Sequence, residues 1–445
     1  MTTATRSGRT SGSQPPSAHG GPPGMPGDAT RAPRGRSAAP VTTRRPGGIG
    51  PVRVQQLVLI ELAFALVLGG WLIHRVMGPV VAAAVALPLV LFGLLRRRGR
   101  PMPEWMSAGR ALKARQRRNA AQVPPGTDPG FVPAVECDPA LRTYSFTDER
   151  EQREIGMVGD GTFLTAVVQV QAVDEPLRPA RGTRSLPLDL LHGALEVDDI
   201  RLASVQVVQH TQPAPAPHLP PQAVAARSYA PLQAQSQTPG LRLTWIALKL
   251  DPELCPEAVT ARGGGMAGAR RALLRAADHL TSRLVGAGLR ARVLTEPEII
   301  AAVATSSCVN PLATTGGAAL DGSRQARRTS ESPRAWRCDD RWHTTYWVSR
   351  WPQLGDRATG LPDLVGLLTS SPALASTFSL VVAPGGSRAS LLSGYVRLTG
   401  RSENELLDAR TQLELRATVS KVGLVRLDRE QVPGILATLP LGGTR

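Results

Sequence analysis

The sequence has little of several residue types on which enzymes and small secreted domains depend. Only three lysines occur among its 445 residues, and aromatic residues make up 4%. The four cysteines, Cys137, Cys255, Cys308 and Cys338, are far apart, with no C-x-x-C pair and no histidine at ligand spacing. We therefore expect neither a zinc site nor a disulfide framework, and we interpret the thiols as buried small hydrophobes in a reducing compartment.

Motifs of common catalytic sites are also missing. None of the lysines follows a glycine, so G-x-x-x-x-G-K-[ST] is absent and a P-loop ATPase is excluded. There is no G-x-S-x-G, H-E-x-x-H or S-x-x-K, and the seven histidines are dispersed. The sequence predicts that the chain is not an enzyme and uses no cofactor or small-molecule substrate.

One glycine-rich motif does match a binding pattern. Residues 263–268 read G-x-G-x-x-G and run into a predicted helix. The preceding predicted strand ends near Leu250, about a dozen residues earlier, so the tight strand–turn–helix geometry of a dinucleotide site is missing. A flexible loop before the helix is the favoured interpretation, and dinucleotide binding is the lesser one.

The net charge of +17 is concentrated near the N-terminus. Residues 1–55 carry eight arginines and one acid, and residues 96–118 carry nine basic residues and one acid. Residues 119–445 are close to neutral, so the basicity belongs to the first quarter of the chain. We expect no nucleic-acid partner, although a membrane-tethered regulator that binds DNA through 96–118 remains an alternative.

The N-terminal region predicts a membrane anchor. Residues 1–52, rich in Gly, Pro and Arg, predict a disordered basic tail. The two apolar runs that follow, 54–73 and 76–95, are each long enough for the ~30 Å hydrocarbon core of a bilayer. We predict that residues 53–96 form a hairpin of two transmembrane helices. Basic flanks then place both termini in the cytoplasm, in a membrane protein with two spans.

Two residues near these runs are candidate contacts. Residues 97–120 predict a basic juxtamembrane segment that lies on anionic headgroups, with Trp105 as an interfacial anchor. Glu61 lies about seven residues into the first apolar run, where a carboxylate is costly. Three interpretations of Glu61 stay open: contact with a helix of a partner subunit, a hydrated or protonated carboxyl near the headgroups, and a proton relay.

Residues 121–445 predict a cytosolic α/β domain, a mixed sheet flanked by helices. Ser402 and Glu405 form a capping box that opens a helix. Loop insertions are predicted near 212–239 and 309–333. The clearest predicted strands and helices cover Thr162–Val173, Leu241–Leu250, Ala267–Gly288, Arg341–Trp351 and Glu403–Thr418.

Aromatic residues gather in one predicted strand. Four of the seven tryptophans fall within sixteen residues, from Trp336 to Trp351. On a strand, Trp342 and Tyr346 share one face, and Trp347 and Trp351 share the other. One interpretation is a platform for an aromatic ligand or nucleic acid. The favoured one is a strand covered on both sides, with some of these aromatics at a protein–protein contact.

Together these features resemble the EccE family, a conserved component of the actinobacterial type VII (ESX) secretion system. The resemblance covers roughly residues 53–439 and rests on the architecture and on the stretch HTTYWVSRWP, His343–Pro352. It implies a non-catalytic structural subunit of the inner-membrane complex that supports translocon assembly and protein export. Its implied partners are membrane lipids and EccB-, EccC- and EccD-like subunits, with ATP hydrolysis on the EccC-like partner. The alternative is a membrane-anchored enzyme of nucleotide-sugar or lipid metabolism.

Overall fold

The computed structural model describes most of the chain beyond the N-terminal tail. The predicted tail 1–52 lies almost entirely outside the described residues, as do most of 212–239 and about half of 309–333, so these predictions stay predictions. The described ranges are 48–49, 52–73, 77–94, 96–97, 100–118, 123–148, 152–172, 186–213, 222–224, 227–228, 240–312, 327–352, 360–385 and 390–443.

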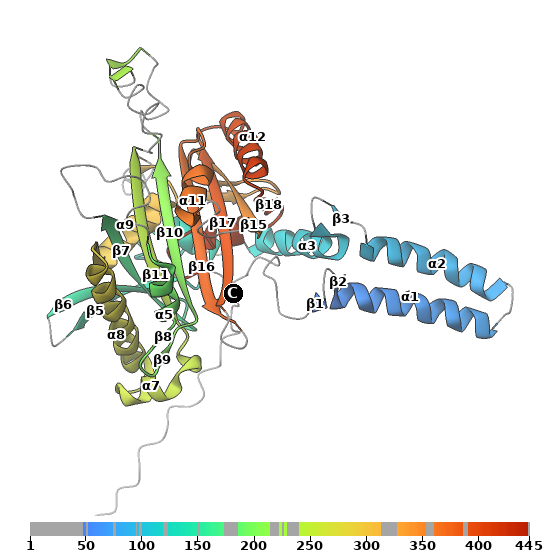
Figure 1. Cartoon of the computed structure of the whole chain (residues 1–445), viewed down its shortest axis with the longest axis horizontal. Helices are drawn as coiled ribbons and strands as arrows, with labels where there is room; N and C mark the ends of the chain where they lie inside the picture. Colours follow the sequence, from blue (N-terminus) through green and yellow to red (C-terminus); the bar gives the residue numbers. More distant parts are fainter. Residues whose placement is uncertain are drawn as a thin grey trace, which may run out of the picture. The chain divides into compact units, whose positions relative to one another are not determined.

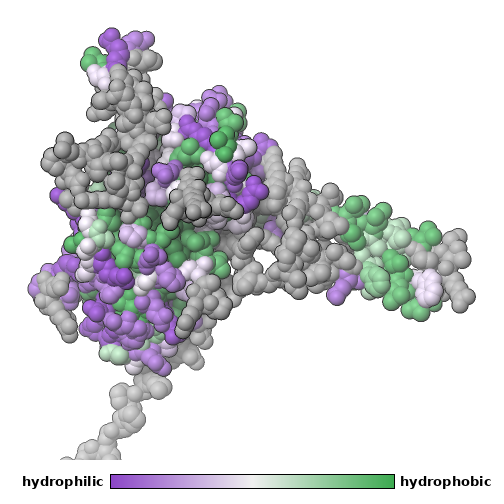
Figure 2. Space-filling model, viewed as in Figure 1, coloured by the Kyte–Doolittle hydropathy of each residue, from purple (hydrophilic) through white to green (hydrophobic). Residues whose placement is uncertain are grey.

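Two apolar helices come first. Helix α1 spans Val54–Ile73, helix α2 spans Met77–Leu94, and the two contact each other. Large apolar side chains on both are exposed, and they give the green surface over α1 and α2 in Figure 2. Two-residue strands flank the pair: β1 (Gly48–Ile49), β2 (Val52–Arg53), β3 (Arg96–Arg97) and β4 (Arg100–Pro101).

The prediction of two transmembrane helices over 54–73 and 76–95 is wrong. Among the residues that the structure describes, no helix combines the length and the apolarity that crossing a bilayer requires. The prediction rested on runs of apolar residues. Such a run shows that a segment avoids water, but it does not identify what covers the segment.

One large sheet forms the body of the molecule (Figure 1). Its main path runs β13-β14-β15-β17-β16-β10-β11-β7-β6-β5, with β12 paired to β7 and β18 paired to β15. The first strands are β5 (Arg142–Asp148), β6 (Arg153–Gly159), β7 (Leu164–Ala172), β10 (Ser204–Gln212), β11 (Leu241–Leu250) and β12 (Leu289–Val293). The later ones are β13 (Thr329–Glu331), β14 (Trp336–Cys338), β15 (Arg341–Arg350), β16 (Ala375–Pro384), β17 (Ser390–Gly400) and β18 (Gly423–Arg426).

Helices cover both faces of this sheet. On one face α5, α7 and α8 share a core with the first strands, and α11 and α12 share one with the later strands. On the other face α4, α9 and α13 pack together over a third core. A small ladder, β8 (Glu196–Val197) with β9 (Ile200–Arg201), and the turn η1 (Pro252–Leu254) complete the element order. The helices are α3 (Met102–Arg118), α4 (Val132–Cys137), α5 (Leu188–Gly193), α7 (Pro256–Ala261), α8 (Gly265–Gly286), α9 (Glu296–Ser306), α11 (Leu361–Thr369), α12 (Glu403–Val419) and α13 (Gln431–Leu436).

The same order of elements occurs twice in this sheet. The first repeat is β5-β6-β7-α5-β10-β11-α8-β12, with β8, β9, η1 and α7 as additional elements, and the second repeat is β13-β14-β15-α11-β16-β17-α12-β18. Strand β7 pairs with β6, β11 and β12, and β15 pairs in the same way with β14, β17 and β18. The repeats join where β10 pairs with β16, in a register centred on Val208 and Ser379. This register relates the repeats by an approximate two-fold axis.

The prediction of a mixed sheet is also wrong. Within the described residues every strand pairing is antiparallel. A strand–helix–strand connection suggests two parallel neighbours. Here, however, a third strand lies between the two connected ones: β11 separates β7 from β10, and β17 separates β15 from β16.

Candidate partner-binding surface

Helix α3 is docked on the domain through Trp105 and Arg429. The guanidinium carbon of Arg429 lies 3.4 Å from the centroid of the Trp105 ring. Arg429 Nη1 also donates a hydrogen bond to the Trp105 carbonyl oxygen at 3.4 Å. A guanidinium stacked on an indole face is a cation–π contact. The predicted interfacial anchor Trp105 is therefore half-buried in a contact within the chain.

Glu331 at the end of β13 holds the other end of α3. Its carboxylate accepts two hydrogen bonds from Arg115, at 2.8 and 2.9 Å, and a third from the backbone N–H of Val432 at 3.0 Å. Arg115 Nη2 also donates to the Arg429 carbonyl oxygen at 2.7 Å. Both partners are largely buried, and the bidentate geometry is the strong form of this ion pair. Glu331 therefore ties α3 to the start of α13.

The opposite side of α3 carries a stripe of cations. Arg110, Lys113, Arg117 and Arg118, here called the basic stripe, are all exposed. Their spacing keeps them near one face of the helix. A groove of about 410 Å³ runs beside them. Its lining residues are Met106, Gly109, Arg110, Leu112, Lys113, Gln116, Pro333 and Arg429.

The aromatic strand β15 packs inside the chain. Tyr346 is 2% exposed and shares a core with Val348 and Trp342, as the strand pattern predicts. The Tyr346 hydroxyl donates to Glu414 at 2.6 Å and accepts from Arg410 Nε at 3.1 Å. Burial, followed by the hydrogen bond to Glu414, raises the pKa of Tyr346. These contacts within the chain account for the burial of Tyr346 on β15.

Trp347 and Trp351 do not share a face as predicted. Trp347 packs with the small core on one side of the sheet, and Trp351 packs with the Tyr346 core on the other. The register shifts between Val348 and Arg350, because a bulge interrupts the alternation of faces. Trp351 lies against Gly394, where a Cβ atom would be 2.5 Å from the indole ring. Both tryptophans are half-buried, and their role as partner contacts stays a prediction.

Glu61 lies on α1, and its side chain is exposed. It is on a different element from the aromatic strand and from the docked face of α3, so the structure does not bring the six predicted contact residues together. Its three interpretations stay open.

The G-x-G-x-x-G motif has a packing explanation. The turn η1 and helix α7 separate the end of β11 from α8, as the long gap in the sequence indicates. Gly263, Gly264 and Gly265 all have positive φ values and form the turn into α8. At Gly268 a Cβ atom would lie 2.2 Å from the Val259 carbonyl oxygen, so only glycine lets α8 pack this closely on α7.

A polar row crosses the centre of the sheet and was not predicted from the sequence. His210, Thr377, Arg397 and Thr345 are cross-strand neighbours on β10, β16, β17 and β15, and all four are fully buried. Arg397 Nη2 donates to the carbonyl oxygen of Ser306, at the end of α9, and to its hydroxyl at 3.0 Å. Within the described residues no carboxylate pairs with Arg397. An arginine at an interior strand position is the one signal that the sequence offers.

Burial shifts the pKa values of this row and its neighbour. Burial lowers the pKa of Arg397 to about 10. Burial, together with the charge of Arg397, lowers the pKa of His210 to about 3. The same two causes hold the pKa of His343 well below its ordinary value. Both imidazoles are therefore neutral at physiological pH.

All four cysteines are free, and burial raises the pKa values of Cys137, Cys308 and Cys338. In the described part of the chain no group of three or more His, Cys, Asp or Glu residues could hold a metal ion.

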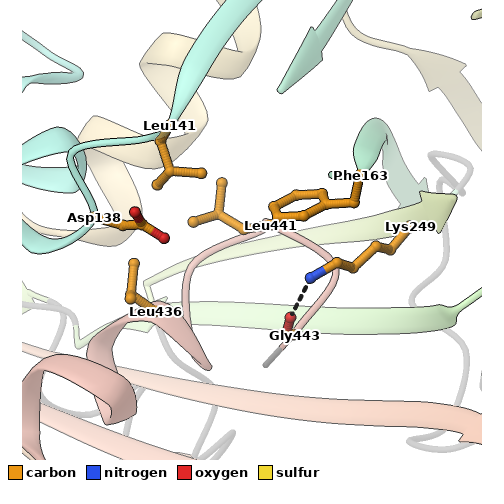
Figure 3. A pocket seen from close by; sticks show the side chains of 7 residues that line it. All are labelled: Asp138, Leu141, Phe163, Lys249, Leu436, Leu441 and Gly443. Atoms are coloured by element: carbon orange, nitrogen blue, oxygen red, sulfur yellow. Dashed lines mark hydrogen bonds between the residues drawn. The ribbon is translucent and has the colours of Figure 1, made fainter. Parts of the chain in front are cut away.

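A pocket under the C-terminal segment is shown in Figure 3. Lys249 Nζ donates to the Gly443 carbonyl oxygen at 3.3 Å and lies 3.7 Å from the Phe163 ring centroid. The pocket volume is about 10 Å³, which admits at most one water molecule.

A family model matches part of the chain. The EccE family, described as a putative type VII ESX secretion system translocon, matches residues 238–348. The matched segment runs from β11 to β15, so it joins the two repeats and includes most of the aromatic strand. The match confirms the resemblance to EccE over these residues. No curated protein matches the chain.

Proposed function

We propose that this chain is a non-catalytic structural subunit of a type VII (ESX) secretion translocon that supports its assembly and protein export. The EccE match over residues 238–348 carries the proposal. The proposed partners are EccB-, EccC- and EccD-like subunits of the same membrane-associated machine, with ATP hydrolysis on the EccC-like subunit.

Packing within the matched segment supports a structural role. Two of its polar side chains contact other parts of the fold: the His343 ring packs at a tilt against Trp336, with ring centroids 4.9 Å apart, and the Tyr346 hydroxyl donates a hydrogen bond to Glu414. The sheet itself is wide and carries helices on both faces. Such an arrangement offers rigid surface to several partners at once.

Helix α3 is the proposed connector between the N-terminal helices and the sheet. It follows α2 in the chain and is held on the domain at both ends, by Trp105 with Arg429 and by Arg115 with Glu331. A connector that is fixed in this way orients the domain within a complex, whereas a free linker would not.

The decisive experiment is affinity purification of the tagged full chain from native membranes under gentle solubilisation. We expect co-elution of an EccC-like ATPase and an EccD-like multi-span subunit. A double variant, Trp105→Ala with Arg115→Ala, should reduce this recovery because it frees α3. Arg271→Ala with Arg275→Ala, two exposed arginines on α8, is the matched control and should leave it unchanged. Recovery of the wild-type chain only as a free monomer would refute the proposal.

A further inference from the structure

The two outer edges of the large sheet differ. Strand β13 at one edge has three residues, and the Glu136 carboxylate of α4 accepts hydrogen bonds from the backbone N–H groups of Arg328 and Thr329, at 2.9 and 2.8 Å. Strand β5 at the other edge has seven residues, and within the described part of the chain it pairs only with β6 (Figure 1). A long edge strand offers its backbone groups to another strand. The open edge of the described sheet is therefore β5.

The register of β5 shows which of its backbone groups face this edge. Ser145 lies opposite Gly156 of β6, and the Gly156 N–H donates to the Leu294 carbonyl oxygen at 2.9 Å, on the side away from β5. Ser145 and Gly156 are therefore a non-hydrogen-bonded pair, in which both residues direct their backbone groups away from each other. Every second residue repeats this geometry, so Thr143, Ser145 and Thr147 direct their N–H and C=O groups to the open edge.

The side chains of β5 complement a second copy of the same strand. Its sequence is RTYSFTD, and an antiparallel pairing centred on Ser145 places Arg142 of each copy opposite Asp148 of the other. The same pairing places Tyr144 of each copy opposite Phe146 of the other. Opposite charges and aromatic pairs directly across an antiparallel ladder are favourable combinations. Tyr144 and Phe146 are half-buried at the edge of the core under α8, so a second strand would extend that core.

We propose that two copies of this chain associate through β5, in a two-fold antiparallel pairing that places Ser145 of one copy opposite Ser145 of the other. Backbone and side chains agree on this register, because the outward groups of Thr143 then bond to those of Thr147 in the second copy. The pairing is closed, since each copy uses the open edge of its sheet. This association goes beyond the proposed subunit role and does not depend on which subunits the chain contacts.

Disulfide trapping in cells that express the full chain tests the register. Ser145→Cys should give a covalent dimer on mild oxidation, because opposed residues of a hydrogen-bonded pair have Cα atoms about 5.5 Å apart, within disulfide range. Thr143→Cys and Thr147→Cys, co-expressed with different tags, should give a heterodimer. Either variant alone should not, because its two copies of the cysteine lie four residues apart along the ladder, about 13 Å. The wild-type chain, with its four native cysteines, measures background cross-linking.

Sedimentation of the purified full chain, in mild detergent that covers α1 and α2, measures the strength of the association. Arg142→Glu and Asp148→Arg each place like charges opposite each other at both ends of the pairing, so each should raise the dimer dissociation constant roughly 30-fold. An equimolar mixture of the two variants restores opposite charges and should return close to the wild-type value. This rescue also shows that both variants are folded. Arg271→Glu, at an exposed position on α8, is the matched control and should behave as wild type.

Three outcomes would overturn the proposal. One is a wild-type chain that stays monomeric while Ser145→Cys gives no covalent dimer; loss of a co-purifying subunit in the charge variants would then assign β5 to another protein. The second is cross-linking of Thr143→Cys alone as efficient as that of the co-expressed pair. The third is a mixture of charge variants that associates no better than either one. Failure of the wild-type chain to recover any translocon subunit would instead refute the proposed function and leave the dimer result intact.

Discussion

The two repeats of the sheet share a topology but differ on the face under α4, α9 and α13. In the first repeat the central strands place Val167 beside Ala247 on this face. The corresponding cross-strand pair in the second repeat is Thr345 with Arg397. At this pair of positions the first repeat has two aliphatic side chains, and the second repeat has a buried cation. The comparison teaches that strand order does not dictate the chemistry of the interior.

The difference between the repeats depends on what covers each one. Arg397 is tolerated because the last turn of α9 offers it the carbonyl oxygen of Ser306, at the negative end of the helix. Gly434 of α13 sits directly over Thr345, where a Cβ atom would be only 2.8 Å from the threonine Cβ. The second repeat is thus adapted to the helices that cover it.

Acid should act first on the two buried histidines, His210 on β10 of the first repeat and His343 on β15 of the second. The unfolded chain takes up protons at His210 and His343 below about pH 6.5, whereas the folded chain does not, because both pKa values are lowered. The full free energy of unfolding is therefore present above that pH and is lost as pH falls. Between about pH 7 and pH 5 the loss should reach at most about 4 kcal/mol for the two groups. Urea unfolding at several pH values between about 7 and 5 measures this loss of unfolding free energy.

The matched variant for this test is His343→Thr, which installs the residue found at the corresponding position of the first repeat, Thr165. The slope of unfolding free energy against pH should fall to about half. An unchanged slope would show that His343 does not stay neutral in the folded protein.

Removal of the Arg397 side chain should have the next largest effect. Arg397→Ala leaves a cavity and an unpaired Ser306 carbonyl, and should lower the free energy of unfolding by about 3 kcal/mol. Arg397→Met keeps most of the volume without a buried charge, and should cost less than about 1.5 kcal/mol. Chemical denaturation followed by tryptophan fluorescence compares the two. Equal losses would mean that the hydrogen bonds of Arg397, and not its volume, stabilise the second repeat.

Glycines in the helices of the two repeats should respond in opposite directions. Gly268→Ala in α8 meets the Val259 carbonyl oxygen and should destabilise the protein by about 2 kcal/mol. Gly366→Ala in α11 has nothing within 4 Å of its new Cβ, so it should stabilise by about 0.5 kcal/mol. Thermal melts of the two variants show whether each substitution stabilises or destabilises the protein. Stabilisation by Gly268→Ala would refute the close contact between α7 and α8.

A small loss of stability is expected at Tyr346→Phe. Position 346 corresponds to the aliphatic Val168 of the first repeat, and the change removes only the hydroxyl that bonds to Glu414 and Arg410. The expected loss is about 1 kcal/mol, the net contribution of such hydrogen bonds. A loss above about 3 kcal/mol in urea unfolding would mean that the hydroxyl supports more than these two contacts.

Local features were predictable from the sequence. The strand predicted at Leu241–Leu250 matches β11, because its residues alternate between two buried faces. Ser402 caps α12 as predicted, since its side chain accepts a hydrogen bond from the Glu405 N–H at 3.2 Å. The aromatic strand is also present, although the bulge before Arg350 moved Trp351 to the other face.

Features that depend on a distant segment were not predictable. Trp105 was predicted as an interfacial anchor, but its ring is covered by Arg429, more than three hundred residues later in the chain. Arg397 carried no recognised motif, because its partner is a backbone carbonyl oxygen that any residue would supply.

The sequence by itself determined where helices and strands form, where the charge is concentrated and which family the central segment matches. Each of these depends on neighbouring residues, through side-chain periodicity, capping and local composition. The tertiary structure alone decided that all strand pairs are antiparallel, that two repeats meet at β10 and β16, and that α3 is docked with its cations outward. These features depend on which surfaces cover one another, and periodicity reports only that a face is covered, not what covers it.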